Sequence, residues 1–323
     1  MVRYKKTKIL VTGAGGFIGH HLVRFLKKKR YWVRGVDIKY PEFSSQREAD
    51  QFLLLDLRDF QNCLKATKGV NKVYNLAANM GGMGFISTVK AEVMRDNVLI
   101  NANMAEAAHR NRVKRLFFSS SACVYSVAKQ KNPRVTALKE GDAYPAEPDN
   151  EYGWEKLFSE RIYQNYHEDH GLDIRIARFH NIFGPEGTFE GGREKAPAAL
   201  CRKVAKAGDG GMIEIWGDGR QTRSFCYIND CLEGVYRLMN SSFREPLNIG
   251  SDRLVTINKL ADIIMGIAGK RLQKKYLSNK PQGVRGRNSD NRLCRKILGW
   301  SPQISLEEGL EQNYQWIANQ IKP

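Results

Sequence analysis

Tyr152 and Lys156 lie four residues apart, a spacing that could support the oxidation of an alcohol. On a helix, residues at this spacing share one face. Tyrosine is a poor base near neutral pH because its unperturbed pKa is about 10, but a nearby positive charge favours the phenolate. The phenolate could then take a proton from a substrate hydroxyl, which Ser121 could hold. The same spacing is common on exposed amphipathic helices, so other segments must support this interpretation.

Cys123 adds a thiol close to this group, and oxidation alone has no use for one. The thiolate is the reactive form, and positive neighbours lower the usual thiol pKa of about 8.5 toward neutrality. The alternative for Cys123 is a small core residue at the end of a strand. We expect core positions for the other cysteines, and no CxxC pair predicts a metal site. These are Cys63, Cys201, Cys226, Cys231 and Cys294.

Gly13, Gly16 and Gly19 form a glycine-rich turn between an apolar run and a helical pattern. Such a turn lets a pyrophosphate approach the backbone and the free N–H groups of the following helix. Asp37 ends the next predicted strand, where a carboxylate binds ribose hydroxyls and repels a 2′-phosphate. This favours NAD over NADP. Asp56 ends the third strand and could meet the adenine amino group or be only a turn residue.

The elements that must position these residues alternate between short apolar strands and helices. We expect strands at 8–12, 32–37, 51–55, 72–76, 115–119 and 173–178, and helices near 18–30, 59–67, 88–110 and 152–170. Further helices are expected near 195–206, 229–240, 257–268 and 306–320, with strands near 213–216 and 246–249. Buried strands between helices predict a parallel sheet covered on both faces, which binds ligands at the carboxyl ends of its strands.

The predicted fold class is therefore α/β. We expect a Rossmann-type doubly wound parallel sheet with a smaller α/β substrate-binding domain formed mainly from C-terminal segments. The expected dinucleotide-binding domain covers residues 1–180, with 222–250 returning to it. The expected substrate domain covers 181–221 and 251–323.

The formal net charge of +18 on 323 residues could serve nucleic acid or a diphosphate ligand, or it could be a solvated basic surface. We favour the solvated surface, because the basic residues are not interleaved with a recognisable nucleic-acid module. No apolar run is long enough to span a bilayer, and we expect no membrane partner. The start of the chain lacks the pattern of a signal peptide, which predicts a cytoplasmic protein.

The chain resembles the extended short-chain dehydrogenase/reductase family, whose members mostly modify nucleotide sugars. The shared segments include the glycine turn, Asn75-Leu76-Ala77-Ala78, Ser119-Ser120-Ser121 and Asn248-Ile249-Gly250. More specific segments are similar to those of family members that epimerise GDP-mannose. They include Met80-Gly81-Gly82-Met83, Ala122-Cys123-Val124, Gly192-Arg193-Glu194-Lys195 and Val284-Arg285-Gly286-Arg287.

The resemblance implies inversion of C3 and C5 of GDP-α-D-mannose, giving GDP-L-galactose, or GDP-L-gulose when only C5 inverts. A transient ketone at C4 acidifies the protons on both neighbouring carbons. By resemblance, Tyr152, Lys156 and Ser121 carry the oxidation, Cys123 is the base and Lys195 is the acid. The implied NAD site also includes Phe17, Ile18, Leu57 and Ala77. The residues implied to hold the GDP-sugar, besides Ser121, Cys123 and Lys195, are Gly81, Gly82, Met83, Ala122, Asn181, Glu194, Ala196, Lys203, Gln221, Arg223 and Arg287.

Two other functions stay open. One is a different nucleotide-sugar enzyme of the family, such as GDP-fucose synthase, which consumes NADPH; Asp37 argues against the extra phosphate. The other is a nucleic-acid-binding protein on a dehydrogenase fold, suggested by the charge. The resemblance also implies a homodimer that pairs through helices of the Rossmann domain. His180 is expected to be structural.

Overall fold

The computed structural model describes residues 7–321, and a seven-stranded parallel sheet forms its centre. The strand order is β11-β6-β5-β4-β1-β2-β3, and every neighbouring pair is parallel. The bounds are β1 Lys8–Thr12, β2 Trp32–Asp37, β3 Gln51–Leu54, β4 Lys72–Asn75, β5 Arg115–Ser121, β6 Ile174–Phe179 and β11 Leu247–Ile249. The order reverses between β1 and β4, and ligands bind at such a switch point in doubly wound sheets.

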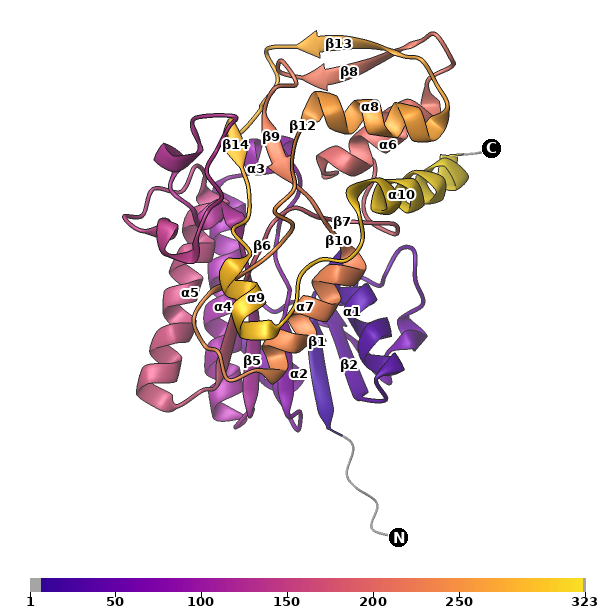
Figure 1. Ribbon diagram of the computed structural model, residues 1–323. Coiled ribbons are helices and arrows are strands. Elements are labelled where there is room, and N and C mark those ends of the chain that lie inside the picture. Colours follow the sequence, from indigo (N-terminus) through magenta and orange to yellow (C-terminus); the bar gives the residue numbers. More distant parts are fainter. Residues whose placement is uncertain (1–6, 322–323) are drawn as a thin grey trace.

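Helices cover both faces of this sheet (Figure 1). On one face lie α1 (Phe17–Lys28) and α7 (Ile228–Asn240), and on the other lie α2 (Phe60–Thr67), α4 (Ala91–Arg110) and α5 (Glu151–His170). Ile9 and Val11 point into the first core, whereas Leu10 points into the second, as the alternation of a strand requires. The Rossmann-type α/β fold predicted from the sequence is confirmed.

The later segments build a smaller layer above the carboxyl ends of the strands (Figure 1). It contains the pair β8–β13, the pair β7–β10 and the three-stranded sheet β12-β9-β14. The strand bounds are β7 Ile182–Phe183, β8 Met212–Trp216, β9 Thr222–Ser224, β10 Cys226–Tyr227, β12 Leu254–Thr256, β13 Gln273–Leu277 and β14 Gly286–Arg287. Its helices are α6 Ala196–Lys206, α8 Ile257–Ala268 and α10 Leu306–Ile321, whereas α3 Met83–Thr88 comes from the first half of the chain and α9 Arg292–Leu298 packs against α7 and β11.

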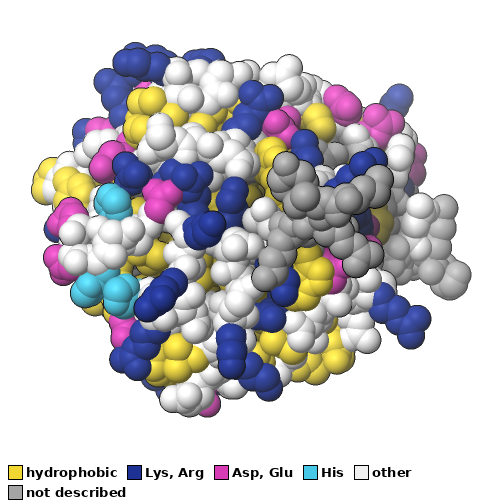
Figure 2. Space-filling view, turned by 90° about the horizontal axis from the view of Figure 1, so that it is seen from below, with side chains coloured by type: hydrophobic (Ala, Val, Ile, Leu, Met, Phe, Trp, Pro, Cys, Tyr) yellow, Lys and Arg dark blue, Asp and Glu magenta, His cyan; other side chains and the backbone are white. Residues whose placement is uncertain are grey.

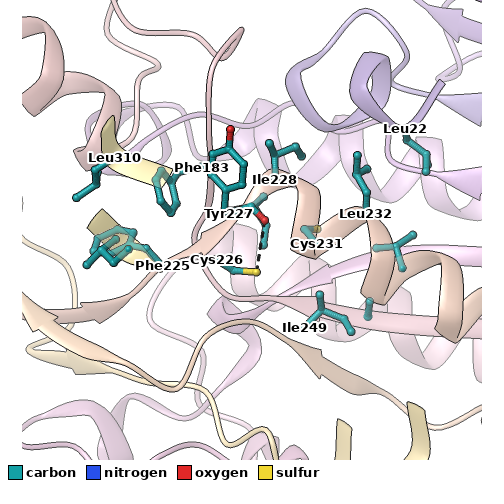
Figure 3. Packing of buried hydrophobic residues seen from close by; sticks show 14 of the residues in the cluster. Leu22, Phe183, Phe225, Cys226, Tyr227, Ile228, Cys231, Leu232, Ile249 and Leu310 are labelled. Atoms are coloured by element: carbon teal, nitrogen blue, oxygen red, sulfur yellow. Dashed lines mark hydrogen bonds between the residues drawn. The ribbon is translucent and has the colours of Figure 1, made fainter. Parts of the chain in front are cut away.

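One core joins the two layers. Phe183, Phe225, Tyr227 and Ile228 pack together beneath α10, and Cys231 of α7 lies in the same cluster (Figure 3). The Cys226 thiol donates to the carbonyl of Tyr227. Continuous apolar packing of this kind holds the upper layer against the sheet.

The structure corrects several predicted bounds. The helix expected near 88–110 is α4, which begins at Ala91, and a separate short helix that was not expected, α3, precedes it at Met83–Thr88. Strand β5 continues to Ser121, two residues beyond the predicted end. Sequence reasoning missed β13, because Gln273-Lys274-Lys275 is polar and its strand conformation depends on pairing with β8. Among residues 7–321, no helix has both the length and the apolar composition needed to cross a bilayer.

Candidate active site

The glycine turn is shaped by close approaches of the backbone. Gly13 has φ of +66°, which favours glycine. A Cβ on Gly19 would lie 1.9 Å from the Gly13 carbonyl oxygen, so only glycine fits there. Helix α1 then starts after Gly16, which offers no side chain to cap the first-turn N–H groups. Those groups are therefore available to an anion.

The other residues of the predicted cofactor site lie around this turn. Asp37 Oδ2 accepts a hydrogen bond from the Gly15 N–H at 2.9 Å, and burial raises the pKa of its carboxyl. The N–H of Ala77 donates to Thr12 Oγ1, which holds the end of β4 beside the turn. Phe17 and Ile18 open α1. Asp56 and Leu57 follow β3, and Asp56 forms an ion pair with Arg58 at 2.6 Å.

Tyr152 and Lys156 lie on α5, facing the end of β5. Tyr152 lies beside Ser121, and burial together with the Glu155 charge raises the pKa of its phenol well above the usual range. Lys156 is fully buried, and its Nζ has no hydrogen-bond partner among residues 7–321. Its nearest counter-charge is Glu155, at 3.6 Å. A buried ammonium without acceptors is costly unless a ligand supplies them.

Cys123 lies at the centre of the site. It belongs to a short 3₁₀ turn, Ala122–Val124, whose Cys123 N–H donates to Ser121 Oγ at 3.2 Å. A Cβ on Gly153 would lie 2.2 Å from the Cys123 carbonyl oxygen, so this turn packs directly on the first turn of α5. The tight packing keeps the thiol close to Tyr152, and the two groups influence each other electrostatically.

Lys195 reaches the same place from the N-terminal end of α6. It is half-buried and enclosed by protein, and this environment lowers the pKa of its ammonium while the Cys123 charge raises it. The segment before it packs against the Gly81–Gly82 loop, where the Gly82 N–H donates to the Arg193 carbonyl at 2.9 Å. A Cβ on Gly82 would lie 2.2 Å from the Glu194 carbonyl oxygen, so glycine is required for this approach.

The remaining predicted sugar-binding residues divide into two groups. Arg223 and Arg287 are paired in register on β9 and β14, and burial together with the Arg287 charge lowers the pKa of Arg223 to about 9. Gln221 is buried next to them, and its Oε1 has no hydrogen-bond partner within residues 7–321. Lys203 and Asn181 instead donate to backbone carbonyls, those of Glu214 and Ser224. Met83, Ala122, Glu194 and Ala196 lie in the segments already described.

His180 is fully buried. One ring nitrogen contacts Asn248 Oδ1 at 2.8 Å, the other has no hydrogen-bond partner in the described part of the chain, and burial lowers the pKa of its imidazole to about 3. The imidazole is therefore neutral near pH 7.

Sequence reasoning missed Gln130 and Asp149. Both accept hydrogen bonds from Arg287, at 2.6 Å and 3.3 Å. Gln130 lies in a short 3₁₀ segment and Asp149 lies just before α5, and neither stands in a recognisable motif. Only the return of β14 across these segments gives them a role.

Comparisons with known proteins identify the class. Residues 9–250 match the model of the NAD dependent epimerase/dehydratase family. The chain belongs to this family. It is 50% identical to GDP-mannose 3,5-epimerase of Arabidopsis thaliana over 316 residues, which cover 98% of this chain and 83% of the relative. It is 31% identical to GDP-L-fucose synthase of Sinorhizobium fredii, with 97% and 96% covered.

Solved structures of the same architecture include two epimerases. UDP-glucose 4-epimerase from Thermotoga maritima, solved with UDP-glucose, gives a TM-score of 0.88 at 25% identity and covers 98% of this chain and 100% of its own. UDP-glucuronic acid 4-epimerase from Bacillus cereus, solved with UDP-glucuronic acid and NAD, gives 0.83 at 26% identity, with 97% and 100% covered.

Proposed function

We propose that the chain epimerises GDP-α-D-mannose at C3 and C5 to GDP-L-galactose, with GDP-L-gulose formed when only C5 inverts. The observation that carries the proposal is the convergence of Cys123 and Lys195 beside the Tyr152–Ser121 pair. A simple dehydrogenase needs only the pair. The similarity to the plant epimerase over nearly the whole chain supports the choice of substrate.

The residues present fit bound NAD. The uncapped N-terminus of α1 and the Gly13–Gly19 cradle suit its pyrophosphate, and Asp37 suits the adenine ribose. Lys156 Nζ is a buried donor without an acceptor among the described residues, and ribose hydroxyls would provide one. When bound, NAD supplies a site that accepts a hydride from C4 and returns it. Ser121 holds the C4 hydroxyl, and Tyr152 takes its proton and later gives it back.

Inversion requires a proton to leave one face of a carbon and return on the other. The C4 ketone makes the C3 and C5 protons acidic because the carbanion delocalises into an enolate. Cys123, as the thiolate, removes the proton, and the Lys195 ammonium delivers one from the opposite side. Burial lowers the pKa of Lys195, which makes its proton easier to donate near neutral pH.

Deuterated water tests the proposal directly. The protein is incubated with GDP-mannose in D₂O, and the sugar is analysed by NMR and mass spectrometry. We expect deuterium at C3 and C5. A sugar recovered without deuterium at either carbon would rule the proposal out.

The GDP-L-fucose synthase relative provides the second candidate function. That reaction would consume NADPH with a 4-keto GDP-sugar. Asp37 already accepts hydrogen bonds from three backbone N–H groups, and its carboxylate would repel a 2′-phosphate. NADPH oxidation above background with the 4-keto sugar would favour this reductase activity.

The basic surface gives less support to nucleic-acid binding. On the face seen from below, Lys and Arg side chains are interspersed with acidic and apolar ones rather than gathered into a stripe (Figure 2). A gel shift at physiological salt tests this alternative, and we expect none.

We also propose a cytoplasmic homodimer with two functional regions. Trp154 and Phe158 are large, exposed and one helical turn apart on α5, and α4 beside it exposes Met94. A second copy of the chain would cover this apolar face. The thiol chemistry of Cys123 suits a reducing compartment. We assign residues 1–180 with 222–250 to NAD and 181–221 with 251–323 to the GDP-sugar. Light scattering tests the dimer, which Trp154→Arg should convert to monomer.

A further inference from the structure

Arg287 has all of its nitrogen atoms engaged by protein partners. Nε donates to Gln130 Oε1 at 2.6 Å, Nη1 donates to Cys123 Sγ at 3.2 Å and Nη2 donates to Asp149 Oδ1 at 3.3 Å. The residue is only 5% exposed. Each Nη carries two hydrogens, so the guanidinium keeps two further N–H donors for a ligand while it holds these three partners.

We propose that Arg287 is a positioning residue for Cys123, which stabilises the thiolate and fixes the direction of its sulfur. This inference rests on the proposed function of Cys123 as the base. A hydrogen bond from a cation is stronger to a thiolate than to a thiol, so the contact favours the form that can remove a proton.

The distances show which partner the guanidinium fits better. Hydrogen bonds from N–H to oxygen usually measure 2.7–3.2 Å, so the contact with Asp149 is long. Sulfur is the larger atom, yet its contact with Nη1 is the shorter of the two. Asp149 thus holds the far side of the guanidinium without drawing it away from the sulfur.

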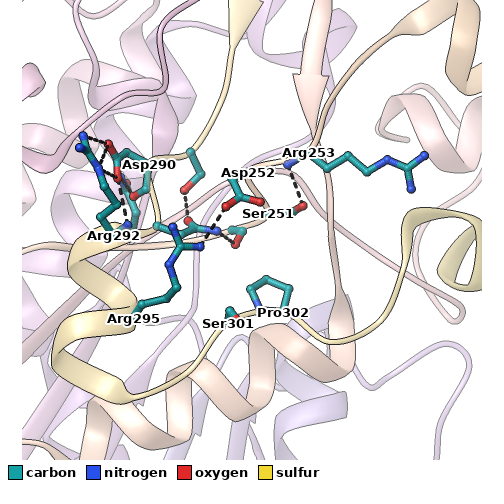
Figure 4. Close-up of polar contacts among 12 residues, drawn as sticks. Ser251, Asp252, Arg253, Asp290, Arg292, Arg295, Ser301 and Pro302 are labelled. Atoms are coloured by element: carbon teal, nitrogen blue, oxygen red, sulfur yellow. Dashed lines mark hydrogen bonds and ion pairs between the residues drawn. The ribbon is translucent and has the colours of Figure 1, made fainter.

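The backbone that carries Arg287 is held firmly. A Cβ on Gly286 would lie 2.2 Å from the Asn132 carbonyl oxygen, so the strand passes close to the segment that supplies Gln130. Beyond Arg287, the side-chain amide of Asn291 donates to the Gly250 carbonyl at 2.7 Å. Figure 4 shows Arg295 of α9 directed at Asp252 of the neighbouring loop. These contacts hold the backbone on both sides of Arg287.

Other cations near Cys123 act in a different way. Lys195 and Arg223 influence the sulfur through their charge, but among residues 7–321 the cation that hydrogen-bonds it is Arg287. We therefore expect Arg287 to have the largest effect on thiolate reactivity.

Alkylation of Cys123 by iodoacetamide tests this inference without requiring turnover. The other five cysteines are buried, so mass spectrometry of the peptide that contains Cys123 follows a single reactive thiol. At pH 7 we expect Arg287→Gln to slow alkylation about tenfold or more, the range expected when a charge-assisted hydrogen bond is lost. At pH 10 the difference should largely disappear, because both sulfurs are then thiolates.

Arg285→Gln is the matched control. It removes the same charge two residues earlier, but its guanidinium pairs with Asp218 at 2.9 Å instead of the sulfur. We expect this variant to alkylate at the wild-type rate. Equal rates for Arg287→Gln and wild type at pH 7, or a slowdown that persists at pH 10, would overturn the inference.

Circular dichroism checks the fold of each variant. If Arg287→Gln does not fold, Arg287→Lys takes its place. The alkylation rate of wild type should then fall less between pH 8 and pH 6 than the alkylation rate of Arg287→Lys. Identical pH profiles would contradict the inference. The deuterium experiment separates the two proposals. Deuterium uptake without the alkylation effect removes only the role of Arg287, whereas the alkylation effect without deuterium uptake removes the epimerase function.

Discussion

The dinucleotide turn, Gly13 to Gly19, and the sugar-side group, Cys123, Lys195 and Arg287, are built in opposite ways. Gly13 to Gly19 form one short segment whose backbone provides the contacts, and close packing at Gly19 fixes its shape. Cys123, Lys195 and Arg287 come instead from the end of β5, the start of α6 and β14. Their side chains do the chemistry, and only packing brings them together. Substitutions in the turn should therefore abolish cofactor binding by steric overlap, whereas substitutions in the sugar-side group should abolish turnover by removing a functional group.

The largest expected effect is at Gly19, where Gly19→Val would place side-chain atoms against the Gly13 carbonyl oxygen. The backbone must shift, and overpacking of this kind typically costs about 1–3 kcal/mol. We expect loss of bound NAD and a lower melting temperature, measured by absorbance and calorimetry. Gly208→Ala is the control, since a Cβ there meets no atom within 4 Å. Full NAD occupancy in Gly19→Val would show that the cradle tolerates a side chain.

Cys123→Ser should abolish the chemistry of the sugar-side group and leave the dinucleotide turn intact. Loss of a general base typically costs about 10²–10⁴-fold in rate, and a serine hydroxyl is a much weaker acid than a thiol. We expect at least a hundredfold loss of turnover, with unchanged melting temperature and NAD content. Undiminished turnover would remove the thiol from the mechanism.

Asp37→Asn should weaken the turn's preference for NAD over NADP without abolishing NAD binding. An amide oxygen can still accept from the Gly15 N–H, but the charge that repels a 2′-phosphate is lost. We expect the ratio of NADP to NAD dissociation constants to fall about tenfold, the effect of roughly 1.4 kcal/mol. An unchanged ratio in a binding titration would mean that other residues exclude NADP.

A last prediction concerns the dependence of stability on pH and leaves both parts of the site unchanged. Burial lowers the pKa of His180 to about 3, from about 6.5 in the unfolded chain. Between these values the unfolded state binds the extra proton, so the free energy of unfolding falls as the pH drops from about 6.5 toward 3. His180 should contribute up to about 3 kcal/mol to the loss between pH 6.5 and 4.

His180→Gln keeps a donor for Asn248 and should flatten this part of the stability curve, measured by urea unfolding. The same slope in both proteins would show that other groups control acid sensitivity. His21, whose pKa burial lowers to about 4, supplies an independent contribution that both proteins share.

A second comparison, within α5, shows why some polar groups indicate function. Glu160 and Arg178 are fully buried and satisfy each other at 2.7 Å, with Ser120 as a further partner. One turn earlier, Lys156 is equally buried, but its Nζ finds no hydrogen-bond partner in the segment 7–321. The Glu160–Arg178 pair satisfies its own hydrogen bonds and is structural, whereas Lys156 leaves a hydrogen-bond donor for a ligand.

The sequence by itself determined the sheet, the glycine turn and the Tyr152–Lys156 pair, because alternating hydrophobicity, glycine spacing and the helical repeat are local properties of the chain. It also supplied Cys123 and Lys195 as candidates, through resemblance rather than spacing. The tertiary structure alone decided that Gln130 and Asp149 hold Arg287 against the Cys123 sulfur. The physical reason is that these residues are far apart along the chain, and no local pattern encodes a contact made only when distant segments pack.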